Sequence, residues 1–119
     1  MKDWVNNLFA ATDLMDADGF VSFLSEDANF RFGNAPIVSG KENIRNTVSA
    51  FFSNLQGLRH NILGIWRQGD TVICEGEVTY TRRNESKITL PFADIFRMKG
   101  KLIADYRIFM DISPLFHLE

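Results

Sequence analysis

The arrangement with the clearest chemical potential is a single acid set among phenylalanines. Leu90, Phe92, Asp94 and Phe96 alternate along the chain and should share one face of a β-strand. Three of these four side chains are large and apolar, and the fourth is a carboxylic acid. Burying a carboxylate costs free energy unless the group is paired, protonated or used in chemistry. Asp94 is therefore the first candidate for a functional group.

His60 is the second candidate, because strand alternation places it on the inward side of another predicted strand, at 58–67. Burial raises the pKa of a carboxyl group above about 3.9, so without a cation nearby Asp94 is expected to be uncharged near neutral pH. An uncharged acid can stabilise a developing enolate, and an ionised one can remove a proton next to a carbonyl. His60 could take the complementary proton role, since imidazole exchanges protons near neutrality. Both residues also have a structural interpretation, in which Asp94 pairs with a buried His or Tyr and His60 is a core or rim histidine.

The remaining candidates are side chains expected to line a cavity and orient a ligand. Some of these candidates are polar: two tyrosine hydroxyls, one indole at the end of a strand and one side-chain amide in a turn. The other candidates form apolar walls. Cys74 is also inward but is expected to be an inert small hydrophobe. The predicted ligand-binding residues are Tyr106, Tyr80, Trp66, Asn34, Phe32, Phe92 and Ile108.

Hydrophobic periodicity predicts the elements that position these residues. We expect a helix over 4–15 capped by Asp3, a short second helix from Phe20 to about 25–27, and a strand over 28–33. Ser39 and Glu42 form a capping box for a third helix that would end before Gly57. The period then changes to two, which predicts four strands at 58–67, 71–82, 86–97 and 101–111.

Short turns between these four strands make neighbours antiparallel. The predicted fold class is α+β, a cone-shaped, curved antiparallel sheet wrapped around helices, because strands of this length must curl. Such a sheet encloses a pocket in which a small ligand can sit. We expect residues 1–119 to form a single domain.

Composition excludes several classes of protein. Eleven phenylalanines among 119 residues indicate a bulky core or an apolar cavity, and a net charge of −2 without a basic block argues against nucleic acid as a partner. The lone Cys74 permits no disulfide or zinc quartet within the chain. The acidic turn at 16–19 is a poor calcium loop, because Leu14 and Ser25 would fall at ligand positions. We therefore expect no metal and no cofactor.

The N-terminal stretch MKDWVNNLF has no apolar signal-peptide region, and no apolar run reaches membrane-spanning length. We expect a cytoplasmic protein that does not bind membranes.

Four segments resemble the nuclear transport factor two superfamily and, more narrowly, its SnoaL-like branch. The resemblance extends over nearly the whole chain, because the order and type of the predicted elements also match those of the family. The resemblance implies the cone-shaped (cystatin-like) fold, whose members include ketosteroid isomerases, polyketide cyclases, epoxide hydrolases and non-catalytic binding or dimerisation domains. The segments are DADGFVSFLSEDANFRFGNAP, SGKENI, LRHNIL and LPFADIFRMKGKLIADYRIFMDISPL.

Residue by residue, the resemblance to ketosteroid isomerases is partial. Asp94 stands where those enzymes keep an aspartate that stabilises an oxyanion. Their base aspartate falls on Phe32, and their catalytic tyrosine falls near Phe9 or Ala10. Only one of the three groups is present.

The charged residues of limonene epoxide hydrolases fall on Gly76, Val78 and Ile108, and their tyrosine and asparagine fall on Phe30 and Phe32. That mechanism is effectively excluded. SnoaL-type cyclases need little beyond one pocket aspartate, for which Asp94 is the counterpart. The resemblance therefore implies a small-molecule pocket protein, a cyclase or isomerase acting on a hydrophobic carbonyl compound by proton transfer.

The alternative is a non-catalytic binding or dimerisation domain of the same fold. For an enzyme or a binding domain the expected partner is a hydrophobic or aromatic small molecule, whereas in a dimerisation domain the pocket would be vestigial. The outward residues Ile73, Ile95 and Phe109 leave an apolar sheet face, which predicts a homodimer through the sheet.

Overall fold

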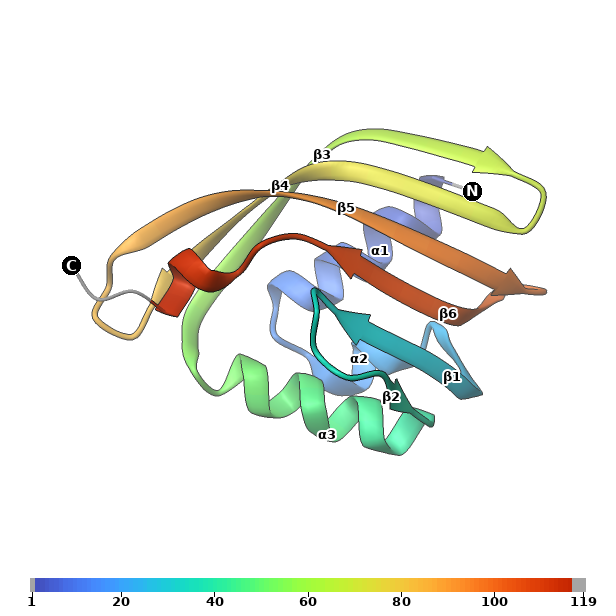
Figure 1. The fold of residues 1–119 in the computed structure, drawn as a ribbon, viewed down its shortest axis with the longest axis horizontal. Helices are drawn as coiled ribbons and strands as arrows, with labels where there is room; N and C mark the ends of the chain where they lie inside the picture. Colours follow the sequence, from blue (N-terminus) through green and yellow to red (C-terminus); the bar gives the residue numbers. More distant parts are fainter. Residues whose placement is uncertain (1, 117–119) are drawn as a thin grey trace.

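The computed structural model describes residues 2–116, which form helices on one side of a long, curved sheet (Figure 1). Three helices and a two-residue strand surround the first long strand, and four strands follow in a meander. The elements are α1 (Lys2–Asp13), α2 (Ala17–Val21), β1 (Leu24–Phe32), β2 (Val38–Ser39), α3 (Lys41–Phe52), β3 (Leu55–Gln68), β4 (Thr71–Arg82), β5 (Lys87–Lys99), β6 (Leu102–Phe109) and the 3-10 turn η1 (Ser113–Phe116).

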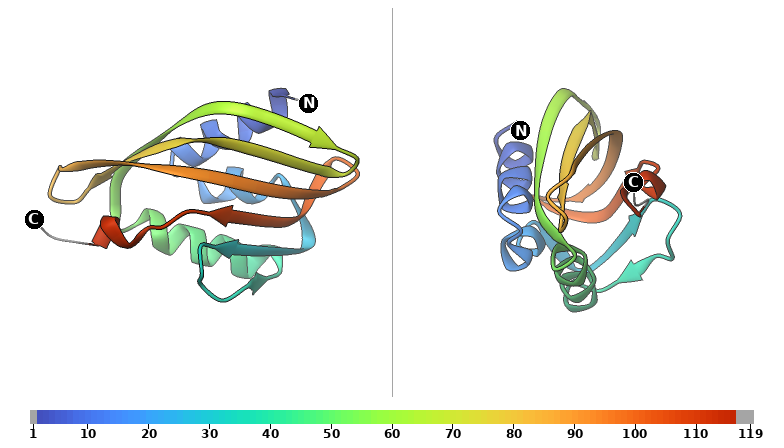
Figure 2. Two further views of the ribbon diagram at one scale, coloured as in Figure 1. Left: turned by 45° about the horizontal axis from the view of Figure 1, so that its top comes forward. Right: turned by 90° about the vertical axis from the view of Figure 1, so that its left-hand side faces the viewer.

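The six strands form one sheet in the order β2-β1-β6-β5-β4-β3. Neighbours are antiparallel except β1 and β6, which run parallel. Because β3, β4 and β5 are 14, 12 and 13 residues long, the right-handed twist of each strand accumulates and the sheet curls (Figure 2). The predicted α+β fold with a curved sheet and helices on one side is confirmed.

The core lies between the helices and the inner face of the sheet. Val5 and Leu8 of α1 and Ile44 of α3 are fully buried at helical spacing. From the sheet, Phe96 and Ile103 are fully buried against them. The phenyl rings of the sheet and the helices leave a hollow toward the middle of β5, described below.

The second helix is shorter than predicted. α2 ends at Val21, and the 25–27 segment lies in β1, where Leu24 and Ser25 are buried. Leu24 pairs with Ile103 and Asn29 with Asp105, so β1 bulges between them. The apolar residues of this segment are buried better as part of the curled sheet than they would be in a longer helix. Pairing with β6 therefore sets the boundary between α2 and β1.

Three predicted helix boundaries are wrong. Asp3 lies inside α1 instead of capping it. The N-cap of α3 is Gly40, with φ +92°, and the Ser39 hydroxyl donates instead to Asn29 Oδ1 at 2.6 Å, which joins β2 to β1. Gly57 does not follow α3, because the chain leaves that helix at Ser53 and Gly57 already lies in β3.

Two β-bulges change which side chains face inward. In β3, Ile62 pairs with Gly76 and Gly64 with Glu75, so Leu63 is an extra residue and the facing alternates in the opposite sense beyond it. Trp66 therefore lies on the outer face and is 54% exposed, and its predicted inward orientation is wrong.

A second shift, between Arg97 and Met98, places Ile103 inward and fully buried. Ala104 is the extra residue of this shift and is only partly buried.

Candidate functional site

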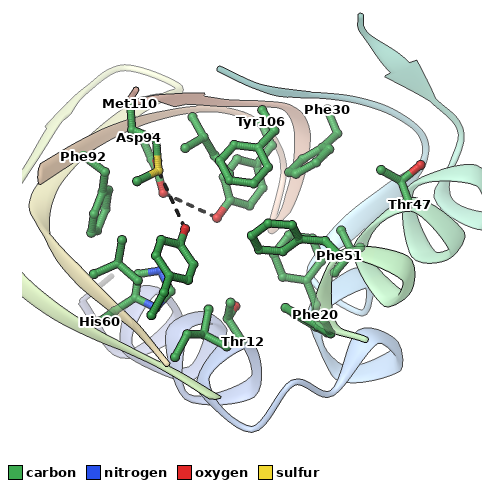
Figure 3. Close-up of a pocket in the computed structure, with 17 residues that line it drawn as sticks. Thr12, Phe20, Phe30, Thr47, Phe51, His60, Phe92, Asp94, Tyr106 and Met110 are labelled. Atoms are coloured by element: carbon green, nitrogen blue, oxygen red, sulfur yellow. Dashed lines mark hydrogen bonds between the residues drawn. The ribbon is translucent and has the colours of Figure 1, made fainter. Parts of the chain in front are cut away.

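A cavity lies between the inner face of the sheet and helices α1 and α3 (Figure 3). The space open to the centre of a water-sized sphere is about 60 Å³, enough for several water molecules. Its walls are almost entirely apolar, with polar atoms at a few positions. The lining residues are Thr12, Phe20, Phe30, Phe32, Thr47, Val48, Phe51, Phe52, Leu58, His60, Val78, Tyr80, Phe92, Asp94, Tyr106, Ile108 and Met110.

Asp94 lies in the middle of β5, in register with Cys74 on β4 and Ile108 on β6, and is 2% exposed. Its Oδ2 accepts a long hydrogen bond of 3.4 Å from the Tyr106 hydroxyl. Its Oδ1 is buried and has no hydrogen-bond partner in the described part of the chain. Burial raises the pKa of the Asp94 carboxyl well above its usual value, and the Tyr106 hydrogen bond opposes this only in part. The protonated acid is the favoured form, and it can donate.

The two tyrosines of the cavity are held as neutral phenols. Tyr106 packs against the rings of Phe20, Phe30 and Phe96, with ring centroids 4.7–5.5 Å apart. The Tyr80 hydroxyl contacts Met110 Sδ at 3.8 Å. Burial raises the pKa of both phenols, and the Asp94 carboxyl raises it further. Both hydroxyls therefore act as hydrogen-bond donors or acceptors and not as phenolates.

Burial likewise raises the pKa of the Cys74 thiol, with a smaller contribution from Asp94. A thiol that stays protonated is a poor nucleophile, so Cys74 is a packing residue beside the site.

His60, on β3, is held by an acid from α1. Asp13 Oδ1 lies 2.6 Å from His60 Nδ1, and the two Asp13 oxygens accept from the His60 backbone N–H at 3.1 and 3.2 Å. The imidazole lies between two phenyl rings, with centroids 4.6 Å from Phe9 and 5.3 Å from Phe92. The ring is thus fixed in position and borders the cavity.

The structure brings together seven of the nine predicted site residues. Asp94, His60, Tyr106, Tyr80, Phe32, Phe92 and Ile108 all line the cavity. Trp66 instead covers Gly64 on the outer face, where a Cβ on that glycine would be 2.5 Å from the indole. Asn34 is exposed in the turn after β1 and borders a separate surface hollow beside Arg31 and Arg107.

Sequence reasoning missed Asp13 and the helix residues of the cavity wall. Asp13 is 47 positions from His60, and nothing local in the sequence links the two. Thr12, Thr47 and Phe51 lie at helix positions whose facing depends on how α1 and α3 pack on the sheet. Their helical spacing would have indicated a buried side but not a cavity.

Among residues 2–116, no three His, Cys, Asp or Glu side chains gather closely enough to hold a metal ion. Within the same residues, every helix is too short or too polar to cross a lipid bilayer. The polar groups of the cavity are those of proton transfer and hydrogen bonding.

A curled sheet backed by helices, with a pocket on its inner face, defines the cone-shaped class that includes nuclear transport factor two and ketosteroid isomerase. The sequence profile of the SnoaL-like domain matches residues 5–106, so the chain belongs to the SnoaL-like family. The predicted family is confirmed. No curated protein matches the chain significantly in sequence.

Solved structures share this fold at low sequence identity. A hypothetical protein of Catenulispora acidiphila with a ketosteroid isomerase-like fold, in complex with trimethylamine, has a TM-score of 0.85 at 17% identity, covering 92% of this chain and 85% of its own. TerC, co-crystallised with polyporic acid, has a TM-score of 0.82 at 19% identity, covering 93% and 91%. A protein of Jannaschia sp., provisionally assigned as a SnoaL-like polyketide cyclase, has a TM-score of 0.77 at 15% identity, covering 93% and 87%.

Proposed function

We propose that this protein catalyses proton transfer on a small, hydrophobic carbonyl compound, in an isomerisation or a cyclisation. The observation that carries the proposal is that Asp94 and His60 border one apolar cavity with complementary proton chemistry. Asp94 is a buried acid whose protonated form is favoured and whose Oδ1 has no partner among residues 2–116. His60 presents a ring fixed by Asp13.

In this proposal His60 removes the proton from the carbon next to the substrate carbonyl. Negative charge moves to the carbonyl oxygen, and the Asp94 O–H donates to it and stabilises the enolate. The imidazolium then returns its proton to another carbon, which isomerises the compound. In the alternative, the enolate carbon attacks a second carbonyl, which closes a ring, and the imidazolium gives its proton to the alkoxide that forms. A positioned acid or base contributes about 10²–10⁴-fold to such a reaction.

The walls of the cavity support a flat, uncharged ligand. Phe32, Phe92 and Ile108 supply apolar surface, and the hydroxyls of Tyr80 and Tyr106 supply polar contacts at the sheet side. Among residues 2–116, no lysine or arginine lines the cavity, so a carboxylate substrate would lack a countercharge from these residues. That TerC was crystallised with polyporic acid supports a small organic molecule as the ligand of this fold.

The test is exchange of the α-protons of β-tetralone in deuterated water, followed by proton NMR. β-Tetralone is a flat, uncharged ketone with acidic α-protons, and exchange requires only the first half of the proposed reaction. We expect the protein to accelerate exchange above buffer, Asp94→Leu to reduce the acceleration about 10²-fold or more, and His60→Gln to reduce it similarly. Acceleration that is equal in wild type and both variants would refute the roles of these residues.

A second candidate is a pocket that binds without catalysis. Phe32 favours it, because this apolar side chain lines the cavity at the position where the resemblance to ketosteroid isomerases would place a base. The cavity is also small, about 60 Å³. A pocket this narrow admits a bicyclic compound only if the phenyl rings of its wall move apart. Saturable binding of β-naphthol, an uncharged aromatic mimic of the β-tetralone enol, with no exchange of β-tetralone protons, is the result this candidate predicts.

We also propose that two chains associate through the outer face of the sheet. Trp66, Ile73 and Ile95 lie in register across β3, β4 and β5, and Phe109 is exposed nearby on β6. An exposed apolar patch of this kind is unfavourable in water and is characteristic of an interface.

A further inference from the structure

α1 ends with an acid in an electrostatically unfavourable place. Asp13 is the last residue of α1, where the helix dipole places partial negative charge and disfavours a carboxylate. The chain then reverses through Met15, whose φ is +56°, a left-handed conformation uncommon for a residue with a side chain. Helix stability therefore does not explain an acid at this position, and the explanation lies in the contacts that Asp13 makes.

One contact of Asp13 has a structural explanation. β3 is one of the two edge strands of the sheet, so on its outer side its backbone N–H groups have no neighbouring strand to accept their hydrogen bonds. The His60 N–H donates to both Asp13 oxygens, at 3.1 and 3.2 Å, which attaches the end of α1 to this edge. Any acceptor of similar shape would satisfy this N–H.

The second contact goes beyond attachment. A carboxylate only accepts hydrogen bonds, so the 2.6 Å contact requires the proton of the neutral imidazole to lie on Nδ1. The lone pair then lies on Nε2, and the side-chain hydrogen bond of His60 found among residues 2–116 uses Nδ1 and not this atom. Phe9 and Phe92 hold the ring from two sides, and the His60 side chain is only 10% exposed. In this arrangement Nδ1 donates to Asp13, and Nε2 keeps a lone pair that can accept a proton.

We propose that Asp13 is a positioning residue that fixes the tautomer and orientation of His60, so that Nε2 is the proton acceptor of the cavity. In the reaction Nε2 takes the proton from the substrate carbon, Nδ1 keeps its own proton, and the Asp13 carboxylate stabilises the imidazolium that forms. Asp13 itself is not protonated at any step. The catalytic part of this inference rests on the proposed function, but the tautomer assignment does not.

Ring-nitrogen NMR of isotope-labelled protein tests the tautomer without any substrate. Spectra are taken at a pH at which the ring is neutral, and the His60→Gln variant identifies which signals belong to His60. We expect an Nδ1–H tautomer in wild type and in Asp3→Asn, a matched control that removes an exposed acid from the same helix. We expect Asp13→Ala to shift the ring toward the Nε2–H tautomer or a mixture. An Nε2–H ring in wild type, or an unchanged tautomer in Asp13→Ala, would overturn the proposal.

The Asp13→Asn variant tests the catalytic part. Its side-chain carbonyl can still accept from the His60 N–H, so α1 stays attached, but the negative charge is gone. In the β-tetralone assay we expect kcat to fall at least about tenfold with KM little changed, while Asp3→Asn behaves as wild type. Equal kcat in Asp13→Asn and wild type contradicts the positioning role. If wild type itself accelerates no exchange, the proposed function fails and the NMR result still decides the tautomer.

Discussion

The Tyr106 hydroxyl donates to Asp94 Oδ2 across 3.4 Å, and the other oxygen of Asp94 is buried with no partner among residues 2–116. One long hydrogen bond cannot replace the hydration that a carboxylate loses on burial. The described ion pairs include none to Asp94. The fold therefore tolerates Asp94 best as an uncharged acid, and this is what makes it useful as a donor toward a developing negative charge.

This relationship predicts how stability depends on pH. The pKa of Asp94 is raised in the folded state, so above the usual carboxyl range the folded protein holds a proton that the unfolded chain releases. The stability that protonated Asp94 provides is complete below about pH 4 and is lost as pH rises through the folded-state pKa. Over that interval, wild type should lose up to about 1.4 kcal/mol of unfolding free energy per pH unit relative to Asp94→Asn.

Urea unfolding of both proteins at intervals between about pH 5 and pH 8 measures this difference. We expect Asp94→Asn to be the more stable protein at the alkaline end, because an amide has no charged form to bury. A constant difference across the whole interval would mean that Asp94 titrates as an ordinary exposed carboxyl.

Gly76 is predicted to shape the sheet beneath the cavity. A Cβ at this position would be 2.3 Å from the carbonyl oxygen of Asn61 and 3.1 Å from Ile62 Cα, both backbone atoms of β3. Because backbone cannot move aside as a flexible side chain can, Gly76→Ala should destabilise the protein by about 1–3 kcal/mol. Thermal or urea unfolding checks this.

The matched control is Gly57→Ala, on the paired strand, where the nearest atom to an added Cβ is Thr81 Cβ at an ordinary 4.0 Å. Its stability should lie close to that of wild type. Equal effects of the two substitutions would show that the loss comes from general strand propensity and not from close approach of β3 to β4.

The proposed homodimer gives a direct prediction for solution mass. Trp66 is 54% exposed, Phe109 52% and Ile73 38%, all on the outer face of the sheet. Wild type should have twice the mass of one chain by light scattering at micromolar concentration, and Ile73→Glu combined with Phe109→Glu should give monomers. Leu14→Glu alters an apolar side chain that is 79% exposed just after α1, on the helix side of the sheet and not on its outer face, and should leave the dimer intact. A monomeric wild type refutes the proposal.

The strands were predictable because period-two alternation over ten or more residues has few other interpretations. β4 matches its predicted range, and β3, β5 and β6 differ from theirs only at the ends. The same alternation correctly brought Asp94 and His60 to one cavity. It failed for Trp66, because the single extra residue at Leu63 reverses the facing and leaves no compositional mark.

The helix ends and the support of His60 were not predictable from local sequence. Ser39 and Glu42 fit a capping box, yet β2 pairs with β1 and the Ser39 hydroxyl donates to Asn29 instead of capping the helix. The Asp13 contact depends on how the end of α1 docks against the edge strand, 47 residues away along the chain. Both features depend on tertiary contacts, which local helix propensity does not predict.

The central claim is that Asp94 is an uncharged acid available to a ligand in the cavity. The most direct measurement is carbon NMR of protein labelled at its aspartate carboxyl carbons, with Asp94→Asn used to assign the signal and β-naphthol titrated at neutral pH. The account predicts that Asp94 carries the chemical shift of a protonated carboxyl before ligand is added and that this signal moves on saturation. An Asp94 signal typical of an ionised carboxylate at neutral pH, or one unaffected by bound β-naphthol, would contradict it.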